Sequence, residues 1–234
     1  MKYVKIVQAR FLRRPNRFVA YVELDGKELL VHVKNTGRCR ELLQPGANVY
    51  LAASGNPARK TPYDLVTVEK LRPGKAPLLV NMDAQAPNEV AAEWLPESGL
   101  FSPNAIFRRE TSWRNSRFDF FIQDGDRKAF LEVKGVTLEY DGHSSFPDAP
   151  TERGIKHLHE LIDCQAEGYE AYVLFVVQMK EMLDFGPSVE NHPDFAKVLQ
   201  KASEANVKIL AMDCIVTPDT VTIDAPVPVV LGHH

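Results

Sequence analysis

Two carboxylates and one lysine stand on two neighbouring apolar stretches of the sequence, in a pattern that can bind a metal ion. Asp119 lies within residues 117–122, and Glu132 and Lys134 lie within residues 129–134. Charged groups are costly to bury unless they compensate one another or hold a cation. Carboxylate oxygens suit Mg²⁺ and Mn²⁺, ions that keep several waters and contact substrate phosphates. The pattern predicts metal-assisted phosphodiester hydrolysis, with Asp119 and Glu132 as metal ligands and Lys134 orienting water or neutralising developing charge.

The segment that joins these stretches predicts how the charged residues meet. Gly125-Asp126 has the composition of the central pair of a hairpin turn. Regular pairing from that turn places Asp119 opposite Glu132, and Lys134 shares their face because side chains alternate along a strand. The competing interpretation is an ordinary cross-strand ion pair on an exposed sheet. The Asp/Glu-x-Lys triplet is weak support by itself, because it occurs three times in the chain.

A third carboxylate is expected from a helix over residues 88–95, which Asn88 has the side chain to cap. Glu89 and Glu93 are four residues apart and share a face of that helix. We prefer Glu93 as the further catalytic residue and keep Glu89 as the alternative.

Histidines are weaker candidates for the site. His157 and His159 are two residues apart on a helix expected over residues 152–167, so they cannot form the i, i+4 metal pair and are interpreted as surface or capping residues. Thr151 is expected to cap that helix. The 3.6-residue period predicts that its inward face carries Ile155, Leu158, Ile162 and Ala166.

The charge of the chain is unevenly distributed and predicts two modules. Residues 1–80 carry 15 Lys+Arg against 6 Asp+Glu, a net charge of +9. Residues 81–234 carry 13 against 25, a net charge of −12. We therefore expect one domain over residues 1–81 and another over residues 82–234.

The first module has the pattern of a five-stranded OB-type barrel with one interposed helix. Its strands are expected over Tyr3–Leu12, Phe18–Leu24, Lys27–Val33, Ala47–Ala53 and Leu65–Leu71, and its helix over Gly37–Leu43. The second module reads as helix, three strands, helix and strand, followed by a helix over Pro193–Glu204 and a last strand over Val207–Val216. That order predicts an α/β domain.

Basic residues cluster at turns and loops of the first module, with Phe11, Phe18 and Tyr21 interleaved. Arginine forks pair with phosphates and aromatic rings stack on bases, so the cluster predicts nucleic-acid binding. The alternative is that the arginines only solubilise the surface. The candidate residues are Arg10, Arg13, Arg14, Arg17, Lys34, Arg38, Arg40, Arg59 and Lys60, together with Arg117, Arg153 and Lys156 from the second module.

The composition is that of a globular protein, with 44% hydrophobic and 25% charged residues. The apolar runs are too short for a membrane span, and the first residues lack the pattern of a secretory signal, so we expect a cytoplasmic protein. Three scattered cysteines are expected to be reduced and structural. His233 and His234 resemble the remnant of a tag and are excluded from the site.

Five separated segments resemble the sugar fermentation stimulation protein A family along nearly the whole chain. They are residues 35–38 (NTGR), 56–60 (NPARK), 116–120 (SRFDF), 131–138 (LEVKGVTL) and 146–158, which contains FPDAPTERG and KHL. The resemblance implies an N-terminal OB-fold domain and a C-terminal restriction-endonuclease-like domain of the PD-(D/E)xK type. It also implies that FPDAPT is an ordered loop leading into the helix after it.

The same resemblance implies DNA binding linked to the regulation of sugar use, notably maltose metabolism. Its nuclease-like signature falls on Asp119, Glu132 and Lys134, and Glu93 matches its helix glutamate better than Glu89. Three functions follow from the sequence. The first is a Mg²⁺- or Mn²⁺-dependent nuclease, and the second is a non-catalytic DNA-binding regulator on a nuclease scaffold. The third, an OB module for an oligosaccharide or a protein partner, explains the arginines poorly.

Overall fold

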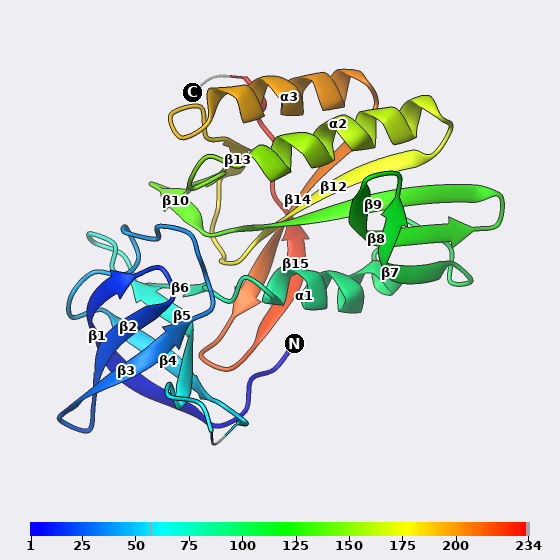
Figure 1. Cartoon of the computed structure of the whole chain (residues 1–234). Helices are drawn as coiled ribbons and strands as arrows, with labels where there is room; N and C mark the ends of the chain where they lie inside the picture. The colour runs from blue at the N-terminus through cyan, green and yellow to red at the C-terminus, as the bar shows by residue number, and fades with distance from the viewer. Residues whose placement is uncertain (57, 233–234) are drawn as a thin grey trace.

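A computed structural model describes residues 1–56 and 58–232 of the chain, so His233 and His234 lie outside the described residues. Two large sheets dominate it, one in each half of the chain (Figure 1). Among the described residues, none of the helices has the length and apolar character needed to cross a membrane.

The N-terminal sheet is a closed barrel, as the OB-type pattern predicts. Its order is β3-β2-β1-β4-β5-β6, and a parallel pairing of β3 with β5 closes it. Alternating residues such as Phe11, Val22 and Leu51 fill its interior. The strands are β1 (Ile6–Asn16), β2 (Val19–Leu24), β3 (Lys27–Val33), β4 (Asn48–Ala53), β5 (Tyr63–Lys70) and β6 (Leu78–Asn81).

The helix predicted over Gly37–Leu43 is wrong, because this segment forms turns. Cys39 has a φ of 44°, which an α-helix does not allow. The carbonyl oxygens of Gly37 and Arg38 accept hydrogen bonds from the Arg14 guanidinium at 2.8 and 3.0 Å. A side chain from β1 therefore takes the acceptors that helical hydrogen bonds would need.

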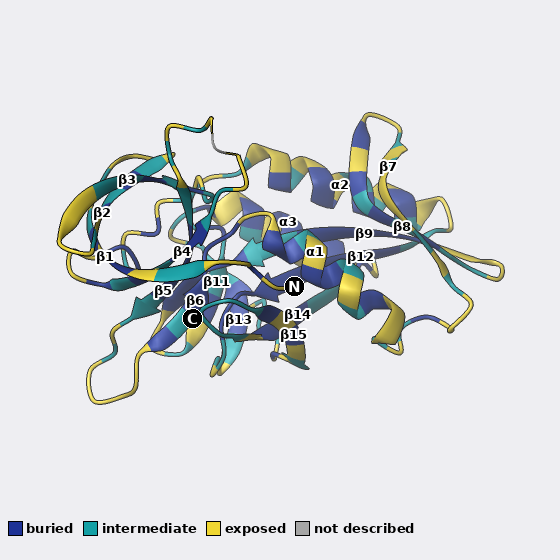
Figure 2. Ribbon diagram, turned by 90° about the horizontal axis from the view of Figure 1, so that it is seen from below, coloured by how far each residue is buried: buried dark blue, intermediate teal, exposed yellow. Residues whose placement is uncertain are grey.

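The C-terminal half is an α/β domain around a second sheet of order β15-β14-β12-β9-β8-β7. Helix α1 lies on one side of this sheet, and α2 and α3 lie on the other (Figure 1). The central strands β9 and β12 are buried along most of their length (Figure 2). The elements are α1 (Ala86–Trp94), the 3-10 turn Leu95–Glu97, β7 (Ile106–Trp113), β8 (Ser116–Asp124), β9 (Arg127–Val136), α2 (Glu152–Ala166), β12 (Glu170–Val177), α3 (Pro193–Glu204), β14 (Lys208–Val216) and β15 (Val221–Pro226).

A small third sheet of order β10-β11-β13 was not predicted from the sequence; β10 and β11 follow β9, and β13 follows β12. Its strands are β10 (Leu138–Tyr140), β11 (His143–Phe146) and β13 (Asp184–Pro187). The second strand ends at Phe146, where the predicted ordered loop FPDAPT begins. The strands have only three or four residues, too few for a period of two to be recognised. Strand β6 was also not predicted, and the strand expected to be the last, over Val207–Val216, is followed by β15.

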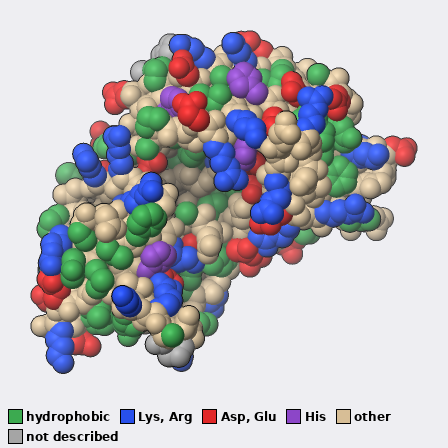
Figure 3. All heavy atoms as spheres, in the orientation of Figure 1, with side chains coloured by type: hydrophobic (Ala, Val, Ile, Leu, Met, Phe, Trp, Pro, Cys, Tyr) green, Lys and Arg blue, Asp and Glu red, His purple; other side chains and the backbone are tan. Residues whose placement is uncertain are grey.

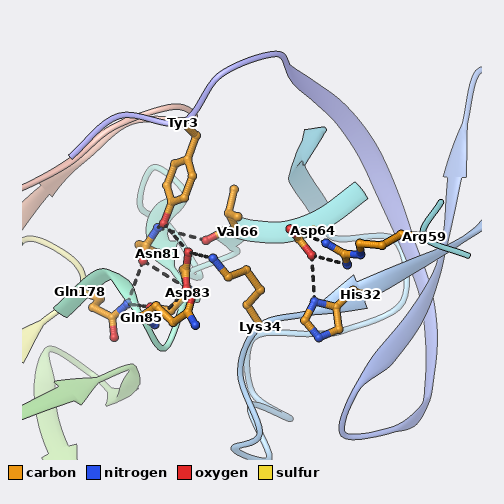
Figure 4. Close-up of polar contacts among 10 residues, drawn as sticks. All are labelled: Tyr3, His32, Lys34, Arg59, Asp64, Val66, Asn81, Asp83, Gln85 and Gln178. Carbon is orange, nitrogen blue, oxygen red and sulfur yellow. Dashed lines mark hydrogen bonds and ion pairs between the residues drawn. The ribbon is translucent and has the colours of Figure 1, made fainter. Parts of the chain in front are cut away.

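Polar side chains join the two halves of the molecule beside a hollow that Figure 3 shows between them. Asp83, between β6 and α1, is fully buried and accepts hydrogen bonds from Lys34 Nζ at 2.6 Å and Tyr3 Oη at 3.2 Å. Asn81 donates to Tyr3 Oη and accepts from Gln178 Nε2 (Figure 4). Burial, and then the charge of Asp83, raises the pKa of Tyr3. The hydroxyl therefore stays protonated and acts as a donor.

A buried ion pair forms a second link between the halves. Lys70 at the end of β5 donates to the carboxylate and the carbonyl oxygen of Glu139 in β10. Only 2% of Glu139 is exposed. Burial would raise the pKa of this carboxyl, but Lys70 and the Gly142 N–H outweigh burial and lower the pKa below its ordinary 4.5.

Replacing Lys70 by methionine is expected to lower the free energy of unfolding at neutral pH by about 3 kcal/mol, because Glu139 stays buried without its partner. The stabilisation should be complete above pH 4.5, the ordinary pKa, and should be lost as pH falls through the lowered folded-state pKa. Urea denaturation of the wild type and the variant, at neutral pH and below pH 4.5, measures the difference in the free energy of unfolding. Lys75→Met, at an exposed loop position, is the matched control. Equal stabilities of the two variants would contradict the prediction.

Candidate metal centre and basic surface

The β8–β9 hairpin carries the candidate carboxylates, and its register is the one predicted. Asp124 pairs with Arg127 across the central residues Gly125-Asp126. The pairing continues in register to Phe120 opposite Leu131 and ends there. Asp119 and Glu132, the next pair along, lie just beyond the regular ladder.

Strand β8 is irregular at Asp119. Phe118 packs in the same hydrophobic cluster as Leu158 of α2, whereas Phe120 packs in the cluster of Val90 of α1. Side chains two residues apart would share a face in a regular strand, so the alternation breaks between them. Opposite this break on β7, Glu110 has a φ of 52°, and its pairing with Asp119 is skipped.

Asp119 is held by one backbone and one side-chain donor. Its Oδ2 accepts from the Val133 N–H at 2.7 Å, which occupies the place of a ladder hydrogen bond. Its Oδ1 accepts from Asn88 Nδ2, also at 2.7 Å. Burial, and then the negative charge of Glu132, raises the pKa of Asp119. The charge of Glu132 therefore opposes the ionisation of Asp119.

Glu132 is almost fully buried, with 4% of its surface exposed. Its Oε1 accepts from Lys134 Nζ at 2.6 Å and from His157 Nδ1. Its Oε2 is buried and has no hydrogen-bond partner among the described residues. Burial would raise the pKa of Glu132, but the hydrogen bond from His157 and the charge of Lys134 lower it. An ionised carboxylate therefore keeps one oxygen free inside the protein.

His157 belongs to this site, so its interpretation as a surface or capping residue is wrong. It is 4% exposed and lies on the buried face of α2 with Gly154, Leu158 and Leu161. Arg153 Nε donates to His157 Nε2 at 3.4 Å, which favours the tautomer whose Nδ1 hydrogen points to Glu132.

The inward face of α2 includes Leu158, as predicted, but it is turned about the helix axis away from the other three predicted positions. Ile155 and Ile162 are only partly buried, and Ala166 is exposed. A stripe through 154, 157, 158, 161 and 164 fits the helical period as well, and it would have placed the histidine inward. Thr151 caps the helix as predicted, accepting the Gly154 N–H at 3.0 Å.

Helix α1 contributes Asn88 to the site. Its first turn begins at Ala86, with Pro87 near the start, so Asn88 lies inside the helix and is not its cap. Glu93 forms an ion pair with the Met1 amino group at 2.5 Å. The Arg109 guanidinium donates two hydrogen bonds, of 2.5 and 2.9 Å, to the carboxylate of Glu89. The described contacts thus connect neither glutamate to Asp119, and they do not support Glu93 as a site residue.

The residues present fit a divalent cation that is held mainly by water and substrate. Within the described parts of the chain, no three His, Cys, Asp or Glu side chains are grouped as a metal cage. What remains is the Asp119 carboxylate, whose ionisation the charge of Glu132 opposes, and the buried Oε2 of Glu132, which has no partner in the described residues. Mg²⁺ commonly uses one or two carboxylates and fills its other positions with waters and phosphate oxygens. Asp119 and Glu132 are the ligands this arrangement offers.

Many of the predicted nucleic-acid-binding side chains have partners within the protein. Arg14 directs its terminal nitrogens at the carbonyl oxygens of Arg17, Asn35, Gly37 and Arg38, so it shapes the barrel loop and has no terminal N–H left for phosphate. The other contacts pair Arg13 with Glu28, Lys34 with Asp83, Arg59 with Asp64, Arg117 with Glu110, Arg153 with His157 and Lys156 with the Asn115 carbonyl oxygen.

Four predicted basic residues are exposed and have no side-chain partner in the described residues: Arg10, Arg38, Arg40 and Lys60. Arg38 and Arg40 line a surface groove of the barrel together with Arg13 and Arg14. Arg17 lies over the ring of Phe18, 4.8 Å from its centroid. Figure 3 shows Lys and Arg side chains on both sides of the hollow between the two halves. The four basic side chains without a partner in the described residues therefore face solvent, where a phosphate backbone could reach them.

Comparison with known proteins gives full-length matches. A family model described as the sugar fermentation stimulation protein RE domain matches residues 85–220, and one described as the SfsA N-terminal OB domain matches residues 12–75. A sugar fermentation stimulation protein homolog of Clostridium beijerinckii is 50% identical over 99% of this chain and 100% of its own. One of Desulfitobacterium hafniense strain Y51 is 53% identical over 94% of each chain. The structure of Pyrococcus furiosus SfsA in complex with Ca²⁺ matches with a TM-score of 0.83 and 27% identity, covering 98% of this chain and 97% of that one.

Proposed function

Because this chain belongs to the sugar fermentation stimulation protein family, we propose that it cleaves phosphodiester bonds of nucleic acid with a divalent metal ion bound by Asp119 and Glu132. The observation that carries the proposal is the buried Oε2 of Glu132, which has no partner in the described residues. Leaving an ionised oxygen buried and unpaired is costly, and a cation would offset that cost. The Ca²⁺ in the structure of the Pyrococcus furiosus relative supports a divalent ion.

The bound cation, Mg²⁺ or Mn²⁺, would polarise the scissile phosphate and make a bound water more acidic. The protein's own residues prepare the site. Asn88 and the Val133 N–H fix the two oxygens of Asp119. His157 and Lys134 hold Oε1 of Glu132 and thereby orient Oε2. The Lys134 ammonium also places a positive charge beside the position where negative charge develops on phosphate.

A second candidate is a DNA-binding regulator that binds metal or phosphate without turnover. The observation that favours it is that Lys134 and His157 already compensate Glu132 within the protein. This function would connect DNA binding with control of sugar use, such as maltose metabolism.

One assay separates the two candidates. The purified protein is incubated with single- and double-stranded DNA and RNA in the presence of Mg²⁺, Mn²⁺ or EDTA, and metal binding is measured by calorimetry. The nuclease proposal expects cleavage that EDTA abolishes. Binding without cleavage under every condition would overturn it and leave the regulator, whereas cleavage that persists in EDTA would exclude the metal mechanism.

The exposed arginines of the barrel, Arg38 and Arg40, give a separate prediction about nucleic-acid binding. The double variant Arg38→Ala/Arg40→Ala is expected to bind DNA more weakly and to lower the slope of log K against log salt by about 2, roughly one unit for each lost phosphate contact. Fluorescence anisotropy over a series of salt concentrations measures this slope. Arg13→Ala is the control, because Arg13 is already paired with Glu28. Unchanged binding by the double variant would place the phosphate-binding surface elsewhere.

A further inference from the structure

A cleft of about 180 Å³ lies between the two halves of the molecule, next to the candidate metal centre. Residues 35–37, in the loop after β3, form its barrel wall, and residues 135–138 form the facing wall. Gly135 directly follows Lys134 on β9. A strand advances about 3.3 Å per residue, so this wall begins roughly 10 Å along the strand from Glu132.

Close contacts and hydrogen bonds hold the walls of the cleft in place. Gly37 approaches Asp148 so closely that a Cβ at this position would lie 2.1 Å from Asp148 Oδ2. The same Oδ2 accepts the Arg38 N–H at 3.0 Å, which connects the barrel loop to the segment before α2. The Arg14 guanidinium donates hydrogen bonds to the carbonyl oxygens of Asn35 and Gly37 and thereby fixes the backbone of the barrel loop. A ligand would therefore meet a wall whose shape is already set.

The chemistry of the lining suits a neutral, polar ligand. Among the described residues, no Lys or Arg lines the cleft, and the one carboxylate that does, that of Asp148, already accepts a hydrogen bond. The hydroxyls of Thr36 and Ser145 have no partner in the described part of the chain. The Gln178 side-chain oxygen points away from the polar network that holds its nitrogen (Figure 4). The cleft thus offers donors, acceptors and the aromatic wall of Phe146, but no charge for a phosphate.

We propose that this cleft binds one unpaired nucleobase of a strand whose phosphate backbone passes the Asp119–Glu132 site. The inference rests on the proposed function for its choice of ligand. A base is a planar, uncharged group with ring donors and acceptors, and it stacks on aromatic side chains. Its own phosphates would point out of the cleft, whose lining includes the Asp148 carboxylate and no basic side chain among the described residues, toward Lys134 on one side and the exposed Arg38 on the other.

The test compares a short fluorescent thymidine oligonucleotide with a strand of equal length that has the same backbone but no bases. Binding of each is measured by anisotropy in Ca²⁺ and in EDTA. The wild type is expected to bind the thymidine strand about tenfold more tightly than the base-free strand, the effect of one seated base. Thr36→Trp and Ser145→Leu, which narrow the cleft from opposite walls, should each remove this difference. Thr222→Trp, exposed on β15 away from the cleft, should preserve it.

Equal binding of the two strands by the wild type would overturn the inference, and so would a base preference that survives both cleft variants. Failure of the proposed function gives a different result. The protein would then neither cleave nucleic acid nor bind Mg²⁺, while the cleft variants would still abolish the preference for a strand with bases. Thymidine monophosphate that competes as strongly as the oligonucleotide would also overturn the inference, because the cleft would then serve a free nucleotide.

Discussion

Glu132→Gln is expected to remove metal-dependent cleavage while leaving the fold intact. Glutamine has the same shape, and its side-chain oxygen can still accept from Lys134 and His157. The variant lacks the negative charge that a cation needs, and it puts an uncharged group at the position of the unpartnered Oε2. Losing one of two carboxylate ligands should lower metal affinity and cleavage by on the order of 10²- to 10³-fold. Titration calorimetry and a timed cleavage assay measure the two effects.

Glu139→Gln is the matched control for this substitution. Glu139 is also a buried glutamate paired with a lysine, but it lies in β10 at the junction of the two halves. This control should lose stability and keep metal binding and cleavage at a temperature where it is folded. Cleavage by Glu132→Gln at the wild-type rate would show that the nuclease activity comes from another site or from a contaminant.

His157→Ala is expected to have the second largest effect, although His157 is not placed to touch metal or substrate. It positions Glu132 by donating to Oε1, and Arg153 in turn fixes its ring. Removing an outer partner of a metal ligand usually lowers metal affinity or activity by about 10- to 100-fold. The buried site also loses a filled volume and a hydrogen bond, so the free energy of unfolding should fall by roughly 2–4 kcal/mol.

Two further variants separate positioning from mere packing. His157→Asn keeps a donor that can reach Glu132 and should recover part of the metal affinity, whereas His157→Leu fills the space and should recover stability alone. His159→Ala, exposed on the same helix, is the control and should match the wild type. If the leucine variant bound metal as tightly as the asparagine variant, a positioning role for His157 would be excluded.

The elements that carry the site follow from local patterns. The Gly125-Asp126 turn fixed the hairpin register correctly as far as Phe120 and Leu131, because a two-residue turn determines which residues pair. The register alone could not show that β8 breaks its alternation at Asp119. That break depends on the Val133 N–H bonding to the Asp119 side chain and on the positive φ of Glu110 on β7.

The basic surface, too, could be predicted from the sequence only in part. Sequence composition found the arginines of the barrel, but it could not distinguish Arg38, which is exposed, from Arg14, whose guanidinium binds four carbonyl oxygens. Both are arginines in a polar context. Only the fold brings residues 35–38 back to β1 and decides which guanidinium is already used.

The sequence by itself determined the two modules, the barrel, the α/β class of the second module and the hairpin that presents Asp119 and Glu132. These follow from turn residues, side-chain periods and charge, which act over short stretches of chain. The tertiary structure alone decided which groups contact the carboxylates of Asp119, Glu132 and Glu93. Asn88 reaches Asp119 across 31 residues and His157 reaches Glu132 across 25, while the expected Glu93 pairs with the chain terminus. Contacts between distant segments depend on how helices pack on the sheet, and no local pattern specifies that packing.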